Sequence, residues 1–292
     1  MENFKETWER YRTTVEEGLD LFLPSEDEYP QSLYRAMRYA VFSGGKRLRP
    51  VLTLATAEAS GADPKLLLPQ AVAIELIHTF TLVHDDLPDI DDDDYRRGKP
   101  TVHKVFGNAI AILTGDALFA LAYKVATVGS IDDSTKVRVL REINDALCYR
   151  GVIEGQVADI ESLQKDPSYE DMLFIHTHKT GKLIEASVVV GAVGAGASGD
   201  KVAMLRTYGR RIGLAFQIMD DILDAVGDES KVGKKLRKDF NKASAVRILG
   251  LEGARRKMNE LIDGAIGVVE DALGSRGEFL KAMANFIRER TY

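Results

Sequence analysis

Apolar residues recur three and four positions apart along almost the whole chain, which is the spacing of one buried helix face. Between Ser32 and Phe42, for example, Leu33, Met37 and Val41 share one face, and a Gly-Gly pair then ends the pattern. The same spacing predicts further helices over residues 50–60, 65–84, 107–127, 134–162, 169–193, 201–225, 243–273 and 278–290. Because the alternation typical of strands is almost absent, the sequence predicts an all-α protein.

No change in composition divides this row of helices. The 292 residues contain no proline-rich or serine-rich linker, so we expect a single domain over 1–292, with residues 1–30 as an N-terminal helical segment. Hydrophobic residues make up 45% of the chain and charged residues 29%, which allows a large core and argues against disorder. The net charge is −6, from 39 basic and 45 acidic residues, and no long basic stripe exists. We therefore do not expect nucleic acid as a partner.

Cysteine usage and the most apolar stretches indicate the compartment. Cys148 is the only cysteine, so no internal disulfide can form, which is typical of a reducing environment. The N-terminal residues are charged and lack an apolar signal core. The two most apolar later stretches are interrupted, one by Asp116 and Lys124 and the other by Glu185, so we expect no membrane span. These features predict a cytoplasmic protein.

The first unusual stretch reads HDDLPDIDDDDYRRGKP, over residues 84–100. Seven of the ten residues from Asp85 to Asp94 are aspartate, and they directly follow a strongly apolar helical pattern. A helix C-terminus already carries the negative end of the helix dipole, so it is an unfavourable place for carboxylates. Like charges this close repel by ~1 kcal/mol or more per pair. The cluster therefore predicts a bound or neighbouring cation.

A second acidic group lies inside the helical pattern FQIMDDILD, residues 216–224. Asp220, Asp221 and Asp224 fall on one side of this predicted helix, and Gln217 lies one turn earlier on the same side. The remaining positions are apolar. Carboxylates on an otherwise apolar helix are costly unless they are paired with cations or bind a metal.

A single acidic run is most often only a solvated loop, but two runs on separate apolar helices make that interpretation much weaker. An EF-hand that began at Asp89 would need glycine where Asp94 stands and glutamate where Pro100 stands. A zinc site is not expected either, because Cys148 stands alone. Oxygen-only ligands favour Mg²⁺, which carboxylates commonly share with substrate phosphates.

Basic residues border the acidic and glycine-rich segments, where guanidinium forks and ammonium groups would suit phosphate oxygens. Alone, such residues would be read as solubilising surface. GGKRLRP contributes three of them, the arginine pair after the first cluster two, HTHKTGK two, and the segment after the second cluster three. They are Lys46, Arg47, Arg49, Arg96, Arg97, Lys179, Lys182, Lys234, Lys235 and Lys242.

Four stretches together resemble one known family. GGKRLRP, HTFTLVHDDLPDIDDDDYRRGKPTVH, HTHKTGKLIEAS and FQIMDDILD are similar, in order and spacing, to the motifs of the polyprenyl synthetase family, the trans-isoprenyl diphosphate synthases. The resemblance runs from about Leu33 to the C-terminus and is strongest to bacterial farnesyl and geranylgeranyl diphosphate synthases. It implies about ten or more helices around a central cavity, a homodimer, and head-to-tail condensation of isopentenyl diphosphate with an allylic diphosphate.

The resemblance also implies roles for particular residues. Mg²⁺, three ions per active site, would be held by Asp85, Asp86, Asp91, Asp220, Asp221 and Asp224. The allylic diphosphate would be contacted by Arg96, Lys179 and Lys234. Isopentenyl diphosphate would be bound by Lys46, Arg49, His78 and Arg97. Lys179, Thr180 and Gln217 would be the catalytic residues of the allylic site, with the Thr180 hydroxyl and the Gln217 amide oxygen facing the cation. The departing diphosphate would take up the proton that is lost at the end.

The length of the product is predicted from fewer residues than the type of reaction is. The family's length rule concerns the residues just before the first aspartate motif, here Phe80 and Thr81, five and four positions before Asp85. Five helical residues span ~7.5 Å, so a bulky ring there would floor the cavity. We expect dimethylallyl or geranyl starters and a C15 product, farnesyl diphosphate, with a C20 product as the alternative. Phe80 as an ordinary core residue, with the floor set by another helix, stays open.

Some features depart from the family or leave rivals open. The segment 227–246 differs from the family pattern: Lys242 and Ser244 remain candidate phosphate contacts, and Asp239 is either a further ligand or a salt-bridge partner. A terpene cyclase would carry a different second metal motif in place of DDILD and would lack GGKRLRP. A non-catalytic partner subunit would be expected to have lost one aspartate motif. An acidic metal-binding interaction protein would bind metal without needing a diphosphate.

Overall fold

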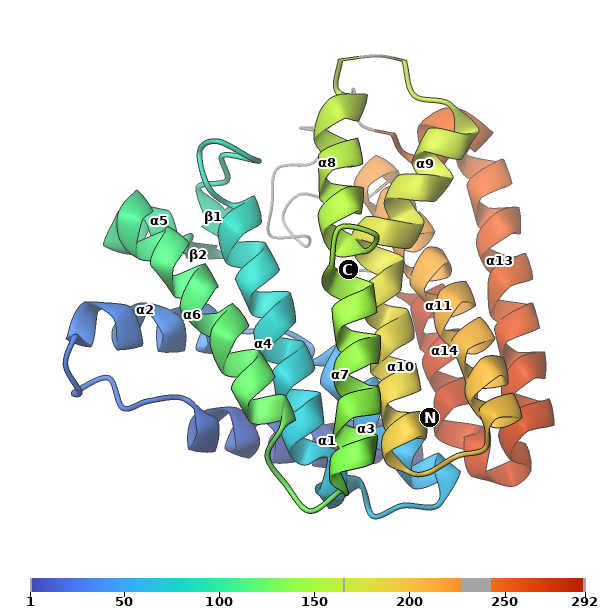
Figure 1. Ribbon diagram of the computed structural model, residues 1–292. Helices are drawn as coiled ribbons and strands as arrows, with labels where there is room; N and C mark the ends of the chain where they lie inside the picture. Colours follow the sequence, from blue (N-terminus) through green and yellow to red (C-terminus); the bar gives the residue numbers. More distant parts are fainter. Residues whose placement is uncertain (1, 165, 227–242, 291–292) are drawn as a thin grey trace.

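The computed structural model describes residues 2–164, 166–226 and 243–290, which are almost entirely helical (Figure 1). The α-helices are α1 (Glu2–Phe22), α2 (Gln31–Phe42), α3 (Leu48–Ser60), α4 (Leu68–Asp85), α5 (Val102–Phe106), α6 (Asn108–Ala126), α7 (Asp133–Leu147), α8 (Val152–Ser162), α9 (Tyr169–Ile175), α10 (Lys182–Gly194), α11 (Gly199–Val226), α13 (Ala245–Leu273) and α14 (Glu278–Glu289). Three short helices are η1 (Pro64–Leu67), η2 (His176–Gly181) and η3 (Gly274–Gly277). The all-α prediction is confirmed.

Helix α10 lies at the centre of the bundle, because its sequence KLIEASVVVGAVG has no polar face. Every residue from Leu183 to Val193 is buried. The helix packs against α3, α7 and α11, and in Figure 1 it runs between α7 and α11. Small residues allow this close packing: a Cβ on Gly191 would lie 2.3 Å from the carbonyl oxygen of Thr53 on α3. A helix that is apolar all round is expected only in a protein core.

The elements that carry the polar motifs pack around this centre. Helix α4 is buried over most of its length and lies along α6, and α11 lies along α13. Helix α1 is attached through aromatic rings, since Phe4 and Trp8 contact Phe279 and Phe286 of α14. The buried apolar side chains from α1 to α14 belong to one cluster. The single-domain organisation stays a prediction of the sequence.

Two predicted elements differ from the structure. The continuous helix expected over residues 134–162 is wrong, because α7 ends at Leu147 and α8 begins at Val152. Gly151 between them has φ −131° and ψ −132°, outside the helical region. The helix expected over 169–193 contains a π-helical turn, η2, between α9 and α10. A two-stranded hairpin of β1 (Tyr95–Arg96) and β2 (Lys99–Pro100) follows the first acidic run.

Two stretches, Pro64–Asp85 and Asn108–Ala126, are long and apolar enough to cross a membrane, judged by length and composition alone. The first, which contains α4, has 67% of its most apolar window buried, as expected for a core helix. For the second, α6, the figure is only 39%. The expectation of no membrane span therefore stays a prediction, and the exposed apolar face of α6 needs its own explanation.

Candidate active site

The first aspartate motif is formed where the chain folds back after α4. The backbone N–H of Asp91 donates to the carbonyl oxygen of Asp85 at 2.9 Å, and that of Asp93 donates to Asp86 at 3.3 Å. This turn brings Asp91 alongside the helix end that carries Asp85 and Asp86. Burial raises the pKa of Asp85 to about 6, and the charge of Asp91 adds to that rise while Lys179 opposes it.

Arg96 from the β1 strand is the countercharge of this motif. Its Nε lies 2.6 Å from Oδ1 of Asp86, and the same guanidinium lies 3.5 Å from Asp93. Asp86 is only 3% exposed, and burial raises its pKa even though Arg96 lowers it. The resemblance assigned Arg96 to the allylic diphosphate; in the structure its guanidinium is paired with Asp86. The helix end is therefore neutralised from within the hairpin that follows it.

The second motif lies on α11. The carboxylate of Asp221 accepts a hydrogen bond from the backbone N–H of Ala245 at 2.6 Å and one from the Gln217 amide at 3.3 Å. The imidazole Nε2 of buried His176 lies 3.3 Å from the same carboxylate. Burial raises the pKa of Asp221 to about 7. Asp220 is ion-paired with Arg290 at 2.9 Å, beyond the end of α14.

The π-helical turn η2 lies between α8 and α11 and supplies Lys179 and Thr180. The Thr180 hydroxyl donates to Oε1 of Gln217 at 2.9 Å, and Nζ of Lys179 lies 2.6 Å from the buried Asp159 of α8. Gly155 of α8 allows this approach, because a Cβ there would lie 2.2 Å from the backbone nitrogen of Lys179. Single π turns inside α-helices are frequent at functional sites. Here the turn brings Thr180 next to Gln217, one turn before the second motif, and brings Lys179 close enough to Asp85 of the first motif to lower the pKa of that carboxyl.

A cavity of about 480 Å³ opens beside the second motif. All four residues that the sequence assigned to isopentenyl diphosphate line it, together with five others. The lining residues are Gly45, Lys46, Arg47, Leu48, Arg49, Glu75, His78, Arg97 and Phe216. Burial lowers the pKa of both Lys46 and Arg49, and the negative charge of Asp220 opposes that shift at both residues, which indicates that the cavity lies close to the second motif.

The cavity is built from a glycine turn and α4. Gly44 and Gly45 have φ 103° and 129°, which residues with a side chain rarely adopt, and Arg97 donates to the carbonyl oxygen of Gly44. Arg49 lies 3.1 Å from Nε2 of His78. Because arginine only donates, this histidine nitrogen is the acceptor and the ring is neutral. Burial and the surrounding guanidinium groups hold the pKa of His78 well below its usual value, and burial lowers that of Arg49 to about 10.

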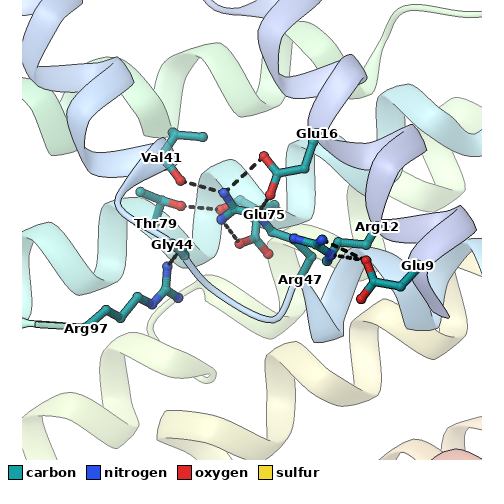
Figure 2. Close-up of polar contacts among 9 residues, drawn as sticks. All are labelled: Glu9, Arg12, Glu16, Val41, Gly44, Arg47, Glu75, Thr79 and Arg97. Atoms are coloured by element: carbon teal, nitrogen blue, oxygen red, sulfur yellow. Dashed lines mark hydrogen bonds and ion pairs between the residues drawn. The ribbon is translucent and has the colours of Figure 1, made fainter. Parts of the chain in front are cut away.

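Four of these residues were missed by the sequence analysis. Asp159 and Gly155 lie in GQVADIES, where a buried acid on an apolar helix was a usable signal. His176 is 3% exposed and was passed over in HTHKTGK. Arg290 places its guanidinium 4.3 Å from the Phe216 ring centroid, and nothing in its local sequence indicates that position. Arg47 also differs from expectation: it is one of the lining residues, but its guanidinium is buried beside the carboxylates of Glu16 and Glu75 (Figure 2).

The remaining predicted residues are placed as follows. The Phe80 ring packs against Phe119 of α6, with ring centroids 5.3 Å apart, and against His84 at 5.8 Å. The Thr81 hydroxyl donates to the carbonyl oxygen of His78 at 2.8 Å. Ser244 caps α13 by accepting from the backbone N–H of Arg247. Four predicted residues lie outside the described part of the chain: Lys234, Lys235, Asp239 and Lys242.

The acidic residues fit a divalent cation that shares its ligands with a phosphate. Within residues 2–164, 166–226 and 243–290, no group of three or more His, Cys, Asp or Glu side chains is already arranged to hold a metal ion. The donors are all carboxylates, and burial together with like charge raises the pKa of Asp85 and Asp221. Such carboxylates gain from a cation, and Mg²⁺ typically completes its shell with substrate phosphates and water.

An all-α bundle with one aspartate motif at the end of α4 and a second one on α11 has the fold of the isoprenyl synthases. A model of the family described as Polyprenyl synthetase matches residues 30–275. The chain therefore belongs to the polyprenyl synthetase family, and it is a prenyltransferase.

Named relatives differ in product length. The chain is 45% identical over 245 residues to farnesyl diphosphate synthase of Geobacillus stearothermophilus, covering 82% of each. It is 39% identical over 284 residues to geranylgeranyl pyrophosphate synthase 4 of Arabidopsis thaliana, covering 96% of this chain and 76% of the relative. The structure of a geranyltransferase from Helicobacter pylori, complexed with magnesium and isoprenyl diphosphate, is similar with a TM-score of 0.86 and 30% identity, covering 97% and 98%.

Proposed function

We propose that this prenyltransferase joins isopentenyl diphosphate to an allylic diphosphate, dimethylallyl or geranyl, and releases farnesyl diphosphate. The observation that carries the proposal is the presence of two cationic groups beside two acidic helix ends. One group lines the cavity and includes Lys46, Arg49 and Arg97. The other, Lys179 and Arg96, interacts with Asp85. Two groups of this kind suit two diphosphate substrates.

The aspartates would hold the metal on the allylic side. Asp85, Asp86, Asp91, Asp220, Asp221 and Asp224 would hold Mg²⁺, three ions per site. Bound there, Mg²⁺ neutralises the charge that develops on the leaving diphosphate. Lys179, held by Asp159, and Arg96, held by Asp86, contribute fixed positive charge to the same oxygens.

The reaction then needs three bond changes. The allylic C–O bond breaks, and its electron pair leaves with the diphosphate. The double bond of isopentenyl diphosphate attacks the resulting cation, which forms the new C–C bond. The attack leaves a tertiary cation on the adjacent carbon; a C–H bond beside that carbon breaks, its electron pair forms the new double bond, and the released diphosphate takes up the proton. Because the Thr180 hydroxyl donates to Gln217, its own oxygen lone pairs remain available to face the cation.

The C15 product rests on Phe80. A ring that sets the length of a cavity must itself be held in place, and Phe80 packs edge-on against Phe119 and His84. This packing supports the floor hypothesis. The alternative is a C20 product. It is supported by the similarity to a geranylgeranyl pyrophosphate synthase, just as the C15 product is supported by the similarity to a farnesyl diphosphate synthase.

Product analysis tests both levels of the proposal. Purified protein is incubated with Mg²⁺, labelled isopentenyl diphosphate and a C5, C10 or C15 allylic diphosphate, and the dephosphorylated products are separated by length. We expect a C15 product from the wild type and longer products from Phe80→Ala. Phe42→Ala, which removes a half-buried ring of α2 that lies beside Arg38, serves as the control and should not change the length. A wild-type C20 product, or an unchanged distribution in Phe80→Ala, would rule out the floor.

We also propose that the enzyme is a homodimer that buries the outer face of α6. Ile112, Leu113 and Phe119 are 45%, 53% and 39% exposed there, and exposed apolar side chains gathered on one helix mark an interaction surface. Light scattering should give twice the chain mass for the wild type. Leu113→Glu should give a monomer, because a buried unpaired carboxylate at an interface is strongly unfavourable. A wild type that is monomeric at micromolar concentration would contradict the proposal.

A further inference from the structure

Arg47 occupies an unusual position within GGKRLRP. Its neighbours Lys46 and Arg49 belong to the cationic lining of the cavity, whereas the Arg47 side chain is 1% exposed and its guanidinium is directed into the protein (Figure 2). Its backbone has φ 53° and ψ 33°, a left-handed conformation that is uncommon for any residue other than glycine. Since Arg47 is also the N-cap residue of α3, this conformation sets the direction of the chain on both sides of it.

Three separate elements hold the Arg47 guanidinium. Nε lies 2.9 Å from Oε1 of Glu16 on α1, and one terminal nitrogen lies 2.8 Å from Oε1 of Glu75 on α4. The other terminal nitrogen donates to the carbonyl oxygen of Val41, at the end of α2, at 2.7 Å. Figure 2 shows these contacts meeting at one point. The single positive charge of Arg47 is therefore paired with two carboxylates inside the protein, and it is committed there rather than to a bound diphosphate.

The same turn is held from its other side by Arg97, which donates to the carbonyl oxygen of Gly44 (Figure 2). Glu75 lies one helical turn before His78 on α4. The same helix therefore supplies a carboxylate that fixes Arg47 and a residue that lines the cavity. A Glu16 side chain without its charge would leave the buried guanidinium with half of its anionic partners. The left-handed conformation of Arg47 would then lose one of the ion pairs that stabilise it, and the neighbouring side chains of Lys46 and Arg49 would shift.

We propose that α1 is a positioning element for the isopentenyl diphosphate side of the site, and that it acts through the Glu16–Arg47 ion pair. The inference rests on the proposed function. Glu16 lies before residue 30, where the match to the family model begins, so this role belongs to a part of the chain that the family match does not include. Glu16 is a positioning residue: it acts on Lys46 and Arg49 through Arg47.

The proposal predicts an effect on one substrate only. Lys46 and Arg49 line the cavity, whereas Lys179 and Asp85, proposed for the allylic side, lie on η2 and α4 and have no contact with Glu16 among the described residues. Small displacements of binding groups have large effects on a fixed geometry. Glu16→Gln should therefore raise the KM for isopentenyl diphosphate by about tenfold, while kcat and the KM for the allylic diphosphate stay within about twofold.

Two control variants separate positioning from a general loosening of α1. Glu9 pairs with Arg12 on the exposed side of the same helix (Figure 2), so Glu9→Gln should change neither KM. Glu58 of α3 binds Arg10 of α1 at 3.0 Å, away from Arg47. Glu58→Gln weakens the attachment of α1 but leaves the Glu16–Arg47 ion pair intact. It should therefore lower the melting temperature and leave the KM for isopentenyl diphosphate unchanged.

Steady-state kinetics on the full-length chain, with calorimetric titration of inorganic diphosphate as a second readout, tests the proposal. We also expect Glu16→Asp, which keeps the charge, to lie closer to wild type than Glu16→Gln, and it takes over the test if the glutamine variant does not fold. An unchanged KM for isopentenyl diphosphate, or an equal rise in both KM values, would overturn the proposal. An inactive wild type would instead contradict the proposed function, and diphosphate affinity that is equal in Glu16→Gln and wild type would still reject the positioning role.

Discussion

The two acidic helix ends of this protein are neutralised in different ways. At the end of α4, Asp86 is paired with Arg96, which follows only ten residues later in the chain. At the end of α11, Asp220 is paired with Arg290 beyond α14, and Asp221 is bound by the N-terminus of α13 and by His176. The first motif therefore carries its own countercharge, whereas the second is completed by segments distant in sequence. An ion pair within one short stretch, such as Asp86 with Arg96, can be predicted from a sequence. Ion pairs between distant segments, such as Asp220 with Arg290, cannot.

The largest expected effect removes one carboxylate from each motif. If both motifs serve the same chemical step, Asp85→Asn and Asp220→Asn should each lower kcat by about 10²–10³-fold, because each removes charge stabilisation from the leaving diphosphate. Asp94→Asn is the matched control within the same acidic run. Asp94 is exposed and pairs with Lys104 at 2.7 Å, so its loss should change kcat by less than about twofold. Equal losses in Asp94→Asn and Asp85→Asn would show that only the charge density of the run matters.

An intermediate effect is expected from the countercharges, and it sharpens the comparison. Arg96→Gln leaves the buried Asp86 without its partner and removes a proposed diphosphate contact, so kcat/KM for the allylic substrate should fall by about 10–100-fold. Arg290→Gln removes a partner that is not proposed to bind that substrate, and the loss should stay below about fivefold. Steady-state kinetics with varied geranyl diphosphate gives both numbers. A larger loss in Arg290→Gln would mean that the distant partner is the more important one.

The smallest expected effect concerns the pH dependence of stability without Mg²⁺. Burial raises the pKa of Asp221 to about 7, so the folded protein holds this proton more tightly than the unfolded chain does. The resulting stabilisation is complete below about pH 4, the pKa of an unfolded aspartate, and is lost as the pH rises through 7. Asp85, with a pKa of about 6, contributes in the same direction.

Urea unfolding of the wild type and Asp221→Asn between pH 4.5 and 8 measures this contribution. Because asparagine does not titrate, the stability of the wild type relative to the variant should decrease across that range and level off above pH 7. The single variant isolates Asp221 from every other titrating group. A difference that does not change with pH would mean that the Asp221 carboxylate is ionised throughout, with the hydrogen bonds from Ala245 and Gln217 sufficient to hold the charge.

Most of the fold could be predicted from hydrophobic spacing. The helix expected over residues 107–127 is α6, Asn108–Ala126, and the one expected over 201–225 is α11, Gly199–Val226. The break between α7 and α8 was not predicted, because apolar residues continue at helical spacing across it. The π turn η2 was not predicted either, since one extra residue in a turn hardly changes the pattern of side chains.

The candidate site was predicted in its composition more than in its contacts. The sequence identified the residues around the cavity, and the structure places Lys46, Arg49, His78 and Arg97 around one space. It did not indicate that Lys179 is held by Asp159, twenty residues earlier and on another helix. The close approach that permits this contact depends on Gly155, whose role is visible only when α8 and η2 are seen together.

By itself the sequence determined the helical class, the two acidic motifs and the set of available cations, because helical periodicity and residue chemistry are local properties of a chain. The tertiary structure alone decided which charges meet. Arg47 is directed toward Glu16 and Glu75 while its neighbours line the cavity, and Arg290 reaches Asp220 across seventy positions of sequence. Ion pairs and hydrogen bonds depend on separations of a few ångströms in space, and separation along the chain does not enter that energy.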